Sequence, residues 1–270
     1  MQLTSRDNPL VREMRLLLAE PKARRESGRF VIEGARLCED AARSGVRIAA
    51  VLYTQRAAEQ YPELLAAVRT ASARQFEIAP PLSQFLGDTR SPQGVFCLCE
   101  ALDNVQMLDT IETDCALSTE QSYLALEDLQ DPGNLGTIIR TAEAMGLGGL
   151  ILSAGCCDLY NPKVLRGSMG GVFRLPAYIT ADMPATAVRL REQGFCMAAC
   201  VPDGDAEPLQ TAVLGPGSIC LIGNEGNGLR PETIEACGSR LTIPMAGRAE
   251  SLNASMAAGI ILWEMARRRL

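Results

Sequence analysis

The sequence contains no histidine among its 270 residues. This absence excludes Ser-His-Asp and Cys-His nucleophile pairs, histidine metal ligands and the usual side chain for proton transfer near neutral pH. Any chemistry must therefore come from carboxylates, arginines, hydroxyls, amides, thiols or a bound cofactor.

Long apolar segments are also missing. No uninterrupted apolar run approaches the roughly 18 residues of a membrane helix, and the amino-terminal stretch "MQLTSRDNPLVREMRLLL" lacks the apolar core of a secretory signal. The composition, 47% hydrophobic and 21% charged, is typical of a soluble globular protein. We therefore predict a protein with no membrane partner that resides in the cytoplasm or in an organelle that the sequence does not reveal.

The ten cysteines lack the paired C-x2-4-C knuckles of a zinc site and the setting of a secreted disulfide framework. Most lie within apolar runs such as "GVFCLC" and "SICLIG". We therefore predict buried, reduced thiols and no metal site.

Charge is unevenly distributed along the chain. The net charge is -6, yet residues 1–36 carry eight basic and five acidic residues, a local net charge of +3. This segment is either a basic arm that contacts nucleic-acid phosphates or a solvated helix face, and charge alone does not distinguish the two.

The first hundred residues alternate between helical and strand patterns. Helices are expected at 35–45, 57–71 and 80–87, and strands at 47–54, 75–79 and 94–100. This pattern predicts a smaller α/β domain over residues 1–103, followed by an irregular, acidic linker over 104–118.

Residues 119–270 begin with a βαβ unit, in which the strand "YLALEDL" leads through "QDPGN" into the helix "NLGTIIRTAEAM" and the strand "GLILS". Further strands are expected at 195–200, 218–223 and 240–245, and a helix at 252–270. The alternation predicts an α/β domain with a mostly parallel sheet, whose ligands bind beyond the carboxyl ends of its strands. On the last helix, Leu252, Met256, Ile260 and Trp263 form one apolar stripe.

Asn134 and Arg140 follow the first of these strands. Asn134 falls where the helix begins, so taken alone it is expected to cap that helix. Arg140 projects from the side opposite the apolar helix face. It is either a solvated arginine or one aimed at a ligand or a partner subunit, and the helical wheel does not choose.

The stretch "LIGNEGNGL", residues 221–229, follows another strand and surrounds Glu225 with glycines. Its order, G-x-x-G-x-G, reverses the spacing of a dinucleotide-binding loop, and it does not open a first βα unit as that motif requires. An oxidoreductase is therefore a distant alternative, and a simple tight turn or another kind of active site remain open.

The stretch "LTIPMAGRAESLNAS", residues 241–255, is the third such strand end. Ser251 and Asn253 present a hydroxyl and an amide at the start of the last helix, where capping by Ser251 is the structural alternative to a role in a site. The density of small and polar groups in neighbouring loops favours a site.

Taken together, the blocks N-x5-R, G-N-E-G-N-G-L and I-P-M-x-G-x-x-E-S-L-N-x-S closely resemble the three motifs of the SpoU (TrmH-type) branch of the SPOUT RNA methyltransferases. The intervening "NPKVLRGSMGGVFRLP" is also similar to that family. The amino-terminal stretches "FVIEGARLCEDAARSG" and "SPQGVFCLCE" resemble its L30e-like substrate-binding domain.

This resemblance implies methyl transfer from S-adenosylmethionine to a ribose 2′-hydroxyl of RNA, and the L30e-like domain favours large-subunit ribosomal RNA as the substrate. It further implies a trefoil knot in residues 119–270 and a homodimer with the final helix near the interface. By motif, the resemblance assigns the cofactor to Gly223, Ile243, Met245 and Leu252, and catalysis to Arg140, Glu225, Asn134, Ser251 and Asn253.

The chemistry leaves the role of Arg140 open. A ribose hydroxyl is a poor nucleophile, so its proton must be removed or polarised while the oxygen is held in line with the methyl group. An arginine ordinarily stays protonated, which favours a phosphate anchor or a stabiliser of the developing alkoxide, whereas the family resemblance gives it a central role in activating the hydroxyl. The alternatives are a noncatalytic RNA-binding or ribosome-assembly protein with the same fold and a transfer-RNA methyltransferase.

Overall fold

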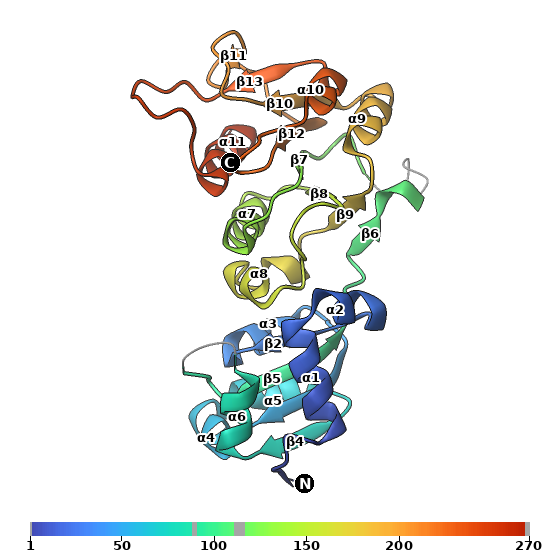
Figure 1. The fold of residues 1–270 in the computed structure, drawn as a ribbon, viewed down its shortest axis with the longest axis vertical. Coiled ribbons are helices and arrows are strands. Elements are labelled where there is room, and N and C mark those ends of the chain that lie inside the picture. The colour runs from blue at the N-terminus through green and yellow to red at the C-terminus, as the bar shows by residue number, and fades with distance from the viewer. Residues whose placement is uncertain (1, 88–90, 111–116, 268–270) are drawn as a thin grey trace. The chain divides into compact units, whose positions relative to one another are not determined.

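The computed structural model describes residues 2–87, 91–110 and 117–267. The chain forms two compact units, each assembled from two separate segments. The first comprises Met1–Asp103 with Asp158–Phe173, and the second comprises Asn104–Cys157 with Arg174–Leu270 (Figure 1).

A five-stranded mixed sheet forms the centre of the first unit, with the order β1-β4-β3-β5-β2. Strand β5 is antiparallel to both of its neighbours, whereas the other pairings are parallel. Its strands are β1 (Gln2–Leu3), β2 (Arg29–Glu33), β3 (Ile48–Tyr53), β4 (Gln75–Ile78) and β5 (Val95–Glu100).

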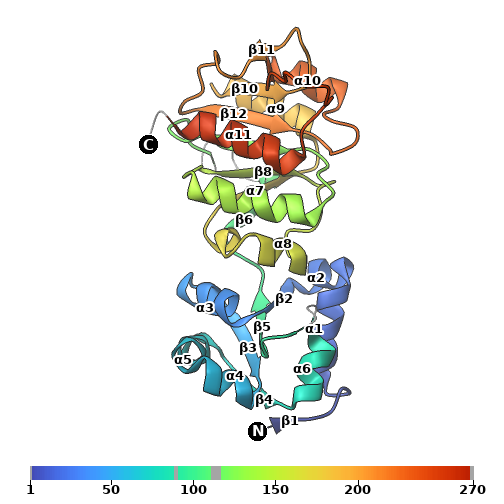
Figure 2. The same cartoon turned by 90° about the vertical axis from the view of Figure 1, so that its left-hand side faces the viewer.

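Helices cover both faces of this sheet (Figure 2). They are α1 (Pro9–Ala19), α2 (Pro21–Ser27), α3 (Ala35–Arg43), α4 (Gln55–Gln60), α5 (Pro62–Ala71) and α6 (Pro80–Leu86). Helix α8 (Pro162–Gly167) lies next to the edge strand β2 and is followed by a 3-10 turn at Gly171–Phe173. The single helix expected at 57–71 is wrong, because Pro62 lacks an amide hydrogen and starts a new helix after Tyr61.

The second unit contains an eight-stranded sheet in which every pairing is parallel. The strand order is β11-β13-β10-β12-β7-β8-β9-β6. Its strands are β6 (Val105–Met107), β7 (Tyr123–Leu126), β8 (Gly149–Ser153), β9 (Ala177–Thr180), β10 (Cys196–Cys200), β11 (Glu207–Pro208), β12 (Ser218–Ile222) and β13 (Arg240–Thr242). The predicted α/β class with a mostly parallel sheet is confirmed.

Helices α7 (Pro132–Ala144) and α11 (Ala254–Ala266) lie side by side on one face of this sheet (Figures 1 and 2). Helices α9 (Met183–Glu192) and α10 (Pro231–Cys237) pack together on the other face. Buried apolar residues from the sheet and from α9 and α10 form a continuous core, which includes Ile151, Leu190 and Ile219. Among the described residues, no helix is long and apolar enough to cross a membrane.

The segment expected as a linker is partly ordered secondary structure. Val105–Met107 pairs with β9 as the edge strand of the second sheet, and a 3-10 turn follows at Leu108–Thr110. The rest of that range includes 111–116, which lie outside the described residues. The domain ranges 1–103 and 119–270 stay predictions, and the compact units differ from them in that Asp158–Phe173 groups with the amino-terminal residues.

The position of the polar loops follows from the strand order. From β7 the chain builds outward through β8 and β9 in one direction, while the later strands β12 and β10 lie on its other side. The carboxyl ends of the neighbouring strands β7 and β12 therefore lie together at a reversal of strand order, where open α/β sheets bind their ligands.

Candidate functional site

Glu225 ties the glycine-rich loop after β12 to the loop after β7. One carboxylate oxygen accepts hydrogen bonds from the Asp131 amide at 2.9 Å and from Asn134 Nδ2 at 3.0 Å, and the other accepts from the Gln130 amide at 3.0 Å. Glu225 thus joins two of the loops that the sequence motifs predicted to converge.

These contacts keep Glu225 ionised. Partial burial alone raises the pKa of the carboxyl, but the hydrogen bonds from Gln130, Asp131 and Asn134 together outweigh it, so the pKa lies below its ordinary value. A carboxylate with a lowered pKa and three bound donors is a poor proton acceptor near neutral pH. The geometry therefore suits Glu225 to positioning rather than to acid-base chemistry.

Asn134 connects this carboxylate to the third loop. Its side-chain oxygen accepts a hydrogen bond from Asn253 Nδ2 at 3.1 Å, while its side-chain nitrogen Nδ2 donates to Glu225. Glu225, Asn134 and Asn253 therefore form one chain of hydrogen bonds that spans all three motifs.

The residues that cap α7 and α11 differ from the two candidates that the sequence offered, Asn134 and Ser251. Helix α7 is capped by Asp131, whose side chain accepts from the Asn134 amide, so Asn134 lies in the first turn instead of capping it. Helix α11 is capped by Asn253, which accepts from the amides of Ser255 and Met256, so Ser251 is not the cap. The Asp131-Pro132 pair at the start of α7 was the sequence signal for its cap, because proline favours the first helical position.

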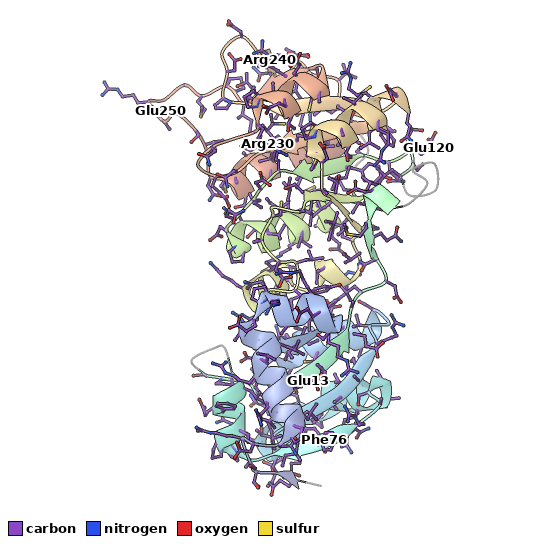
Figure 3. The ribbon with its side chains drawn as sticks, turned by 45° about the vertical axis from the view of Figure 1, so that its right-hand side comes forward. Glu13, Phe76, Glu120, Arg230, Arg240 and Glu250 are labelled. Carbon is purple, nitrogen blue, oxygen red and sulfur yellow. The ribbon has the colours of Figure 1, made fainter. Side chains whose placement is uncertain are left out.

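A cavity of about 480 Å³ lies beside this network, within the second unit. It is lined mainly by the glycine-rich loop, by β13 and the loop that follows it, and by the start of α11. Figure 3 shows Glu250 on the long loop that leads to α11. The predicted cofactor contacts Gly223, Ile243, Met245 and Leu252 all line the cavity, as do Glu225 and Ser251. Their assignment to a cofactor stays a prediction.

Gly223 is required by the fold of its own loop. Asn224 and Gly228 exchange two backbone hydrogen bonds, at 2.9 and 3.0 Å, which folds the loop back on itself. A Cβ atom on Gly223 would collide with the backbone of Gly228 and Leu229. The close approach of two backbone segments is therefore enough to require glycine here, whether or not a ligand also approaches this position.

Arg140 stands apart from the cavity. It is exposed on α7, opposite the buried face that contains Leu135, Ile138 and Ile139, as the helical pattern predicted. Within the described part of the chain, no residue forms a hydrogen bond or ion pair with its side chain, and Arg140 does not line the cavity. Ser251 lines the cavity but likewise has no hydrogen-bond partner in the described residues.

Sequence reasoning missed Glu127 and its partners. This carboxylate, at the end of β7, is buried and binds Arg230 and Thr233 at the start of α10. Its signal was a charged residue inside the apolar run "YLALEDL". Among the described residues, no group of three or more potential ligand side chains is placed to hold a metal ion.

The comparisons with known proteins agree with these motifs. Residues 121–263 match the SpoU rRNA Methylase family, and residues 8–97 match the MRM3-like substrate binding domain. The chain is 32% identical to the 23S rRNA (uridine(2479)-2′-O)-methyltransferase of Streptomyces viridochromogenes, over 100% of this chain and 93% of the relative. It is 28% identical to the 23S rRNA (guanosine(2553)-2′-O)-methyltransferase RlmP of Bacillus subtilis, over 98% of both.

A crystal structure of an AdoMet-bound rRNA methyltransferase from Sinorhizobium meliloti superposes with a TM-score of 0.85 at 30% identity, covering 100% of this chain and 98% of that one. The sequence match extends over more than half of the chain, and the structural match extends over all of it. This chain therefore belongs to the SpoU rRNA methylase family.

Proposed function

We propose that this protein is an S-adenosylmethionine-dependent methyltransferase that modifies a ribose 2′-hydroxyl of RNA. The observation that carries this proposal is the hydrogen-bonded chain Glu225–Asn134–Asn253, which joins the three family motifs beside one cavity. Relatives that cover nearly the whole chain are 2′-O-methyltransferases by name, which supports the reaction class.

The cavity fits the cofactor in size and charge. Its volume, about 480 Å³, lies within the roughly 300–1,000 Å³ typical of small-molecule sites. Among the described residues that line it, the only charged ones are Glu225 and Glu250, both carboxylates. Two negative charges favour a cationic ligand such as a sulfonium and disfavour the phosphates of a nicotinamide dinucleotide. The same observation speaks against the oxidoreductase alternative.

When bound, S-adenosylmethionine supplies an electrophilic methyl group, so the protein must bring a ribose oxygen in line with it. Glu225, Asn134 and Asn253 tie together three loops, of which those after β12 and β13 line the cavity. Gly223, Ile243, Met245 and Leu252 contribute its walls, and Ser251 offers a free hydroxyl at its edge. These residues orient the reactants and do not themselves exchange protons.

Arg140 acts on the RNA in this proposal. A guanidinium remains protonated and presents several donors in a plane, so it suits a phosphate or a developing alkoxide. Because its side chain is exposed and has no partner in the described residues, it is available to a substrate. We assign it to stabilising the ribose oxygen as negative charge develops there, with the substrate phosphate as the second group that it contacts.

The substrate that we propose is large-subunit ribosomal RNA. The named relatives act on 23S rRNA, one on a guanosine and one on a uridine, and residues 8–97 match a substrate-binding domain. A search for lost ribose methylation across total RNA, in cells with and without the protein, identifies the nucleotide. Loss of a site in transfer RNA alone would contradict the ribosomal assignment.

The assembly that we propose is a cytoplasmic homodimer with a knotted second unit. The parallel sheet and the family membership support the knot. An exposed apolar stripe supports the dimer: the exposed fractions are 40% for Leu252, 62% for Met256, 39% for Ile260 and 53% for Trp263. Met256, Ile260 and Trp263 lie on α11, whereas Leu252 precedes the helix, which begins at Ala254 and not at the expected residue 252. An exposed apolar surface of this kind is typical of one covered by a partner.

Calorimetry with S-adenosylmethionine tests the reaction class directly. We expect binding at one site per chain, abolished when the cavity is filled by Ala257→Trp. No binding, even with ribosomal RNA present, would instead indicate a noncatalytic protein that retains the fold.

A further inference from the structure

Two glutamates form hydrogen bonds between the segments that follow β7 and β12. Glu225 follows β12 and binds the loop after β7, whereas Glu127 follows β7 and binds residues after β12. The segment 223–230, which follows β12, is therefore attached through Glu225 near its start and through Arg230 at its end. Glu225 lies in one of the three sequence blocks named above, whereas Glu127 lies outside them.

Glu127 makes four contacts with the far end of this segment. One oxygen accepts from Arg230 Nε at 2.9 Å, Arg230 Nη2 at 2.7 Å and Thr233 Oγ1 at 2.6 Å, and the other accepts from the Arg230 amide at 2.9 Å. The exposed fraction of Glu127 is 1%. A buried carboxylate is tolerated when it is paired and fully hydrogen-bonded, as this one is.

The fastened segment forms one wall of the cavity. Residues 223–229 all line it, and three of them are glycines. Asn224 folds the loop back on Gly228 and binds the Asp128 carbonyl, but glycine-rich backbone has many accessible conformations. Release of the Arg230 end would therefore add conformational freedom that the ligand must remove. Ordering that is complete before binding leaves more of the interaction energy for affinity.

We propose that Glu127 is a positioning residue for the cofactor: by holding Arg230 and Thr233, it keeps residues 223–230 in the cavity-forming conformation before the cofactor binds. This inference rests on the proposed function. It assigns Glu127 no contact with the cofactor and no part in proton transfer.

The test compares wild-type protein with Glu127→Gln. Glutamine keeps the shape but turns an acceptor oxygen into a donor that faces other donors. We expect the calorimetric affinity for S-adenosylmethionine to fall about tenfold, as for loss of a hydrogen bond to a charged group. The KM for the cofactor should rise by the same factor while kcat at saturation stays near the wild-type value.

Hydrogen exchange separates positioning from general destabilisation. Without cofactor, the amides of residues 223–230 should exchange faster in Glu127→Gln than in wild type, and saturating S-adenosylmethionine should restore their protection. The control is Asp109→Asn, an exposed carboxylate that binds Thr180 Oγ1 and the Ala181 amide near the β6 edge of the sheet, away from β7 and β12. Its cofactor affinity should match that of wild type.

Arg230→Gln is the second variant, used if Glu127→Gln does not fold. The Arg230 side chain is 48% exposed, and Glu127 keeps the Arg230 amide and Thr233 as partners, so we expect a smaller loss of affinity, about threefold. If the folded variant binds S-adenosylmethionine with wild-type affinity, and the amides of residues 223–230 exchange hydrogen at the wild-type rate, this inference is wrong but the proposed function stands. A wild-type protein that binds no S-adenosylmethionine overturns the proposed function and this inference with it.

Discussion

At the scale of single residues, Arg140 carries the proposed chemistry without contributing to the fold. Its side chain is exposed and has no partner in the described residues, so removing it should leave folding intact. We expect Arg140→Ala to lower the rate of methyl transfer at least about 100-fold, a typical effect of losing a donor that stabilises an oxyanion. Cofactor affinity and the melting temperature should stay at wild-type values.

Single-turnover methylation of the target RNA measures this effect. Arg56→Ala, which removes an exposed arginine from α4, controls for the loss of one positive charge. Near-normal transfer by Arg140→Ala would contradict the assignment of this residue.

Glu225 makes a different prediction, because its pKa lies below the ordinary value of 4.5. A group with a lowered folded pKa stabilises the folded state above its unfolded pKa, and that contribution disappears as the pH falls through the folded pKa. We therefore expect wild type to melt at a higher temperature than Glu225→Gln near about pH 7, and the difference to shrink below about pH 4.

Thermal melts across this pH range measure the difference, with Glu63→Gln, an exposed carboxylate on α5, as the control. A difference that is constant with pH would show that the hydrogen bonds of Glu225 do not depend on its ionisation.

The sequence predicted which polar residues converge, but not how they bind one another. The order of the motifs along the chain placed Asn134, Glu225 and Asn253 at neighbouring strand ends. The direction of each hydrogen bond depends on side-chain geometry, which the spacing of residues along the chain does not reveal. The sequence therefore pointed to Asn134 and Ser251 as helix caps, whereas Asp131 and Asn253 cap the two helices. Glu127 was overlooked for a related reason, because its partners lie more than 100 positions away.

At the scale of elements, α11 presents an apolar stripe whose partner we propose to be a second copy. Trp263 is the single tryptophan of the chain and is 53% exposed, so its fluorescence reports on burial of this stripe. We expect its emission to shift to longer wavelength on dilution as the dimer dissociates. Met256→Glu, on the same stripe, should show the long-wavelength emission at all concentrations.

Analytical ultracentrifugation on the same samples gives the mass. The control is Val213→Ser, because Val213 is 79% exposed but lies between β11 and β12, away from the stripe. A monomeric mass for wild type, with emission independent of concentration, would rule out the proposed dimer.

Element types were more predictable than element ends. The strong apolar runs at β3, β8 and β12 were assigned correctly, because long or strictly buried runs leave few alternatives. Short edge strands such as β6 and β11, at Val105–Met107 and Glu207–Pro208, were missed. Edge strands of two or three residues owe their conformation to pairing with a neighbour, which local sequence does not encode.

At the scale of the whole molecule, the segment Asp158–Phe173 is held to the amino-terminal residues by a buried ion pair. Arg24 Nε donates to Asp158 at 2.6 Å, and the exposed fractions of the two side chains are 2% and 14%. Arg24 also donates to the carbonyls of Leu17 and Leu18. We expect Asp158→Ala to lower the free energy of unfolding by about 3 kcal/mol, because it leaves a buried guanidinium without its counter-charge.

Urea unfolding followed by circular dichroism measures this loss. The double variant Arg24→Leu with Asp158→Leu should recover part of it, since apolar replacement of both partners removes the unpaired charge. Lys22→Ala, which breaks the exposed pair with Glu26, should change stability by less than about 1 kcal/mol. Equal losses in the single and double variants would contradict this account.

The same segment limits where the chain can be cleaved or fused without dividing one of the two units. The chain passes between the two units after residues 103, 157 and 173, so no single scission releases either unit intact. A fragment starting at residue 104 would carry Asp158 without Arg24, its buried ion-pair partner. Gene fusion at one junction would therefore exchange residues 1–103 without residues 158–173, so a replacement amino-terminal segment must supply its own partner for Asp158.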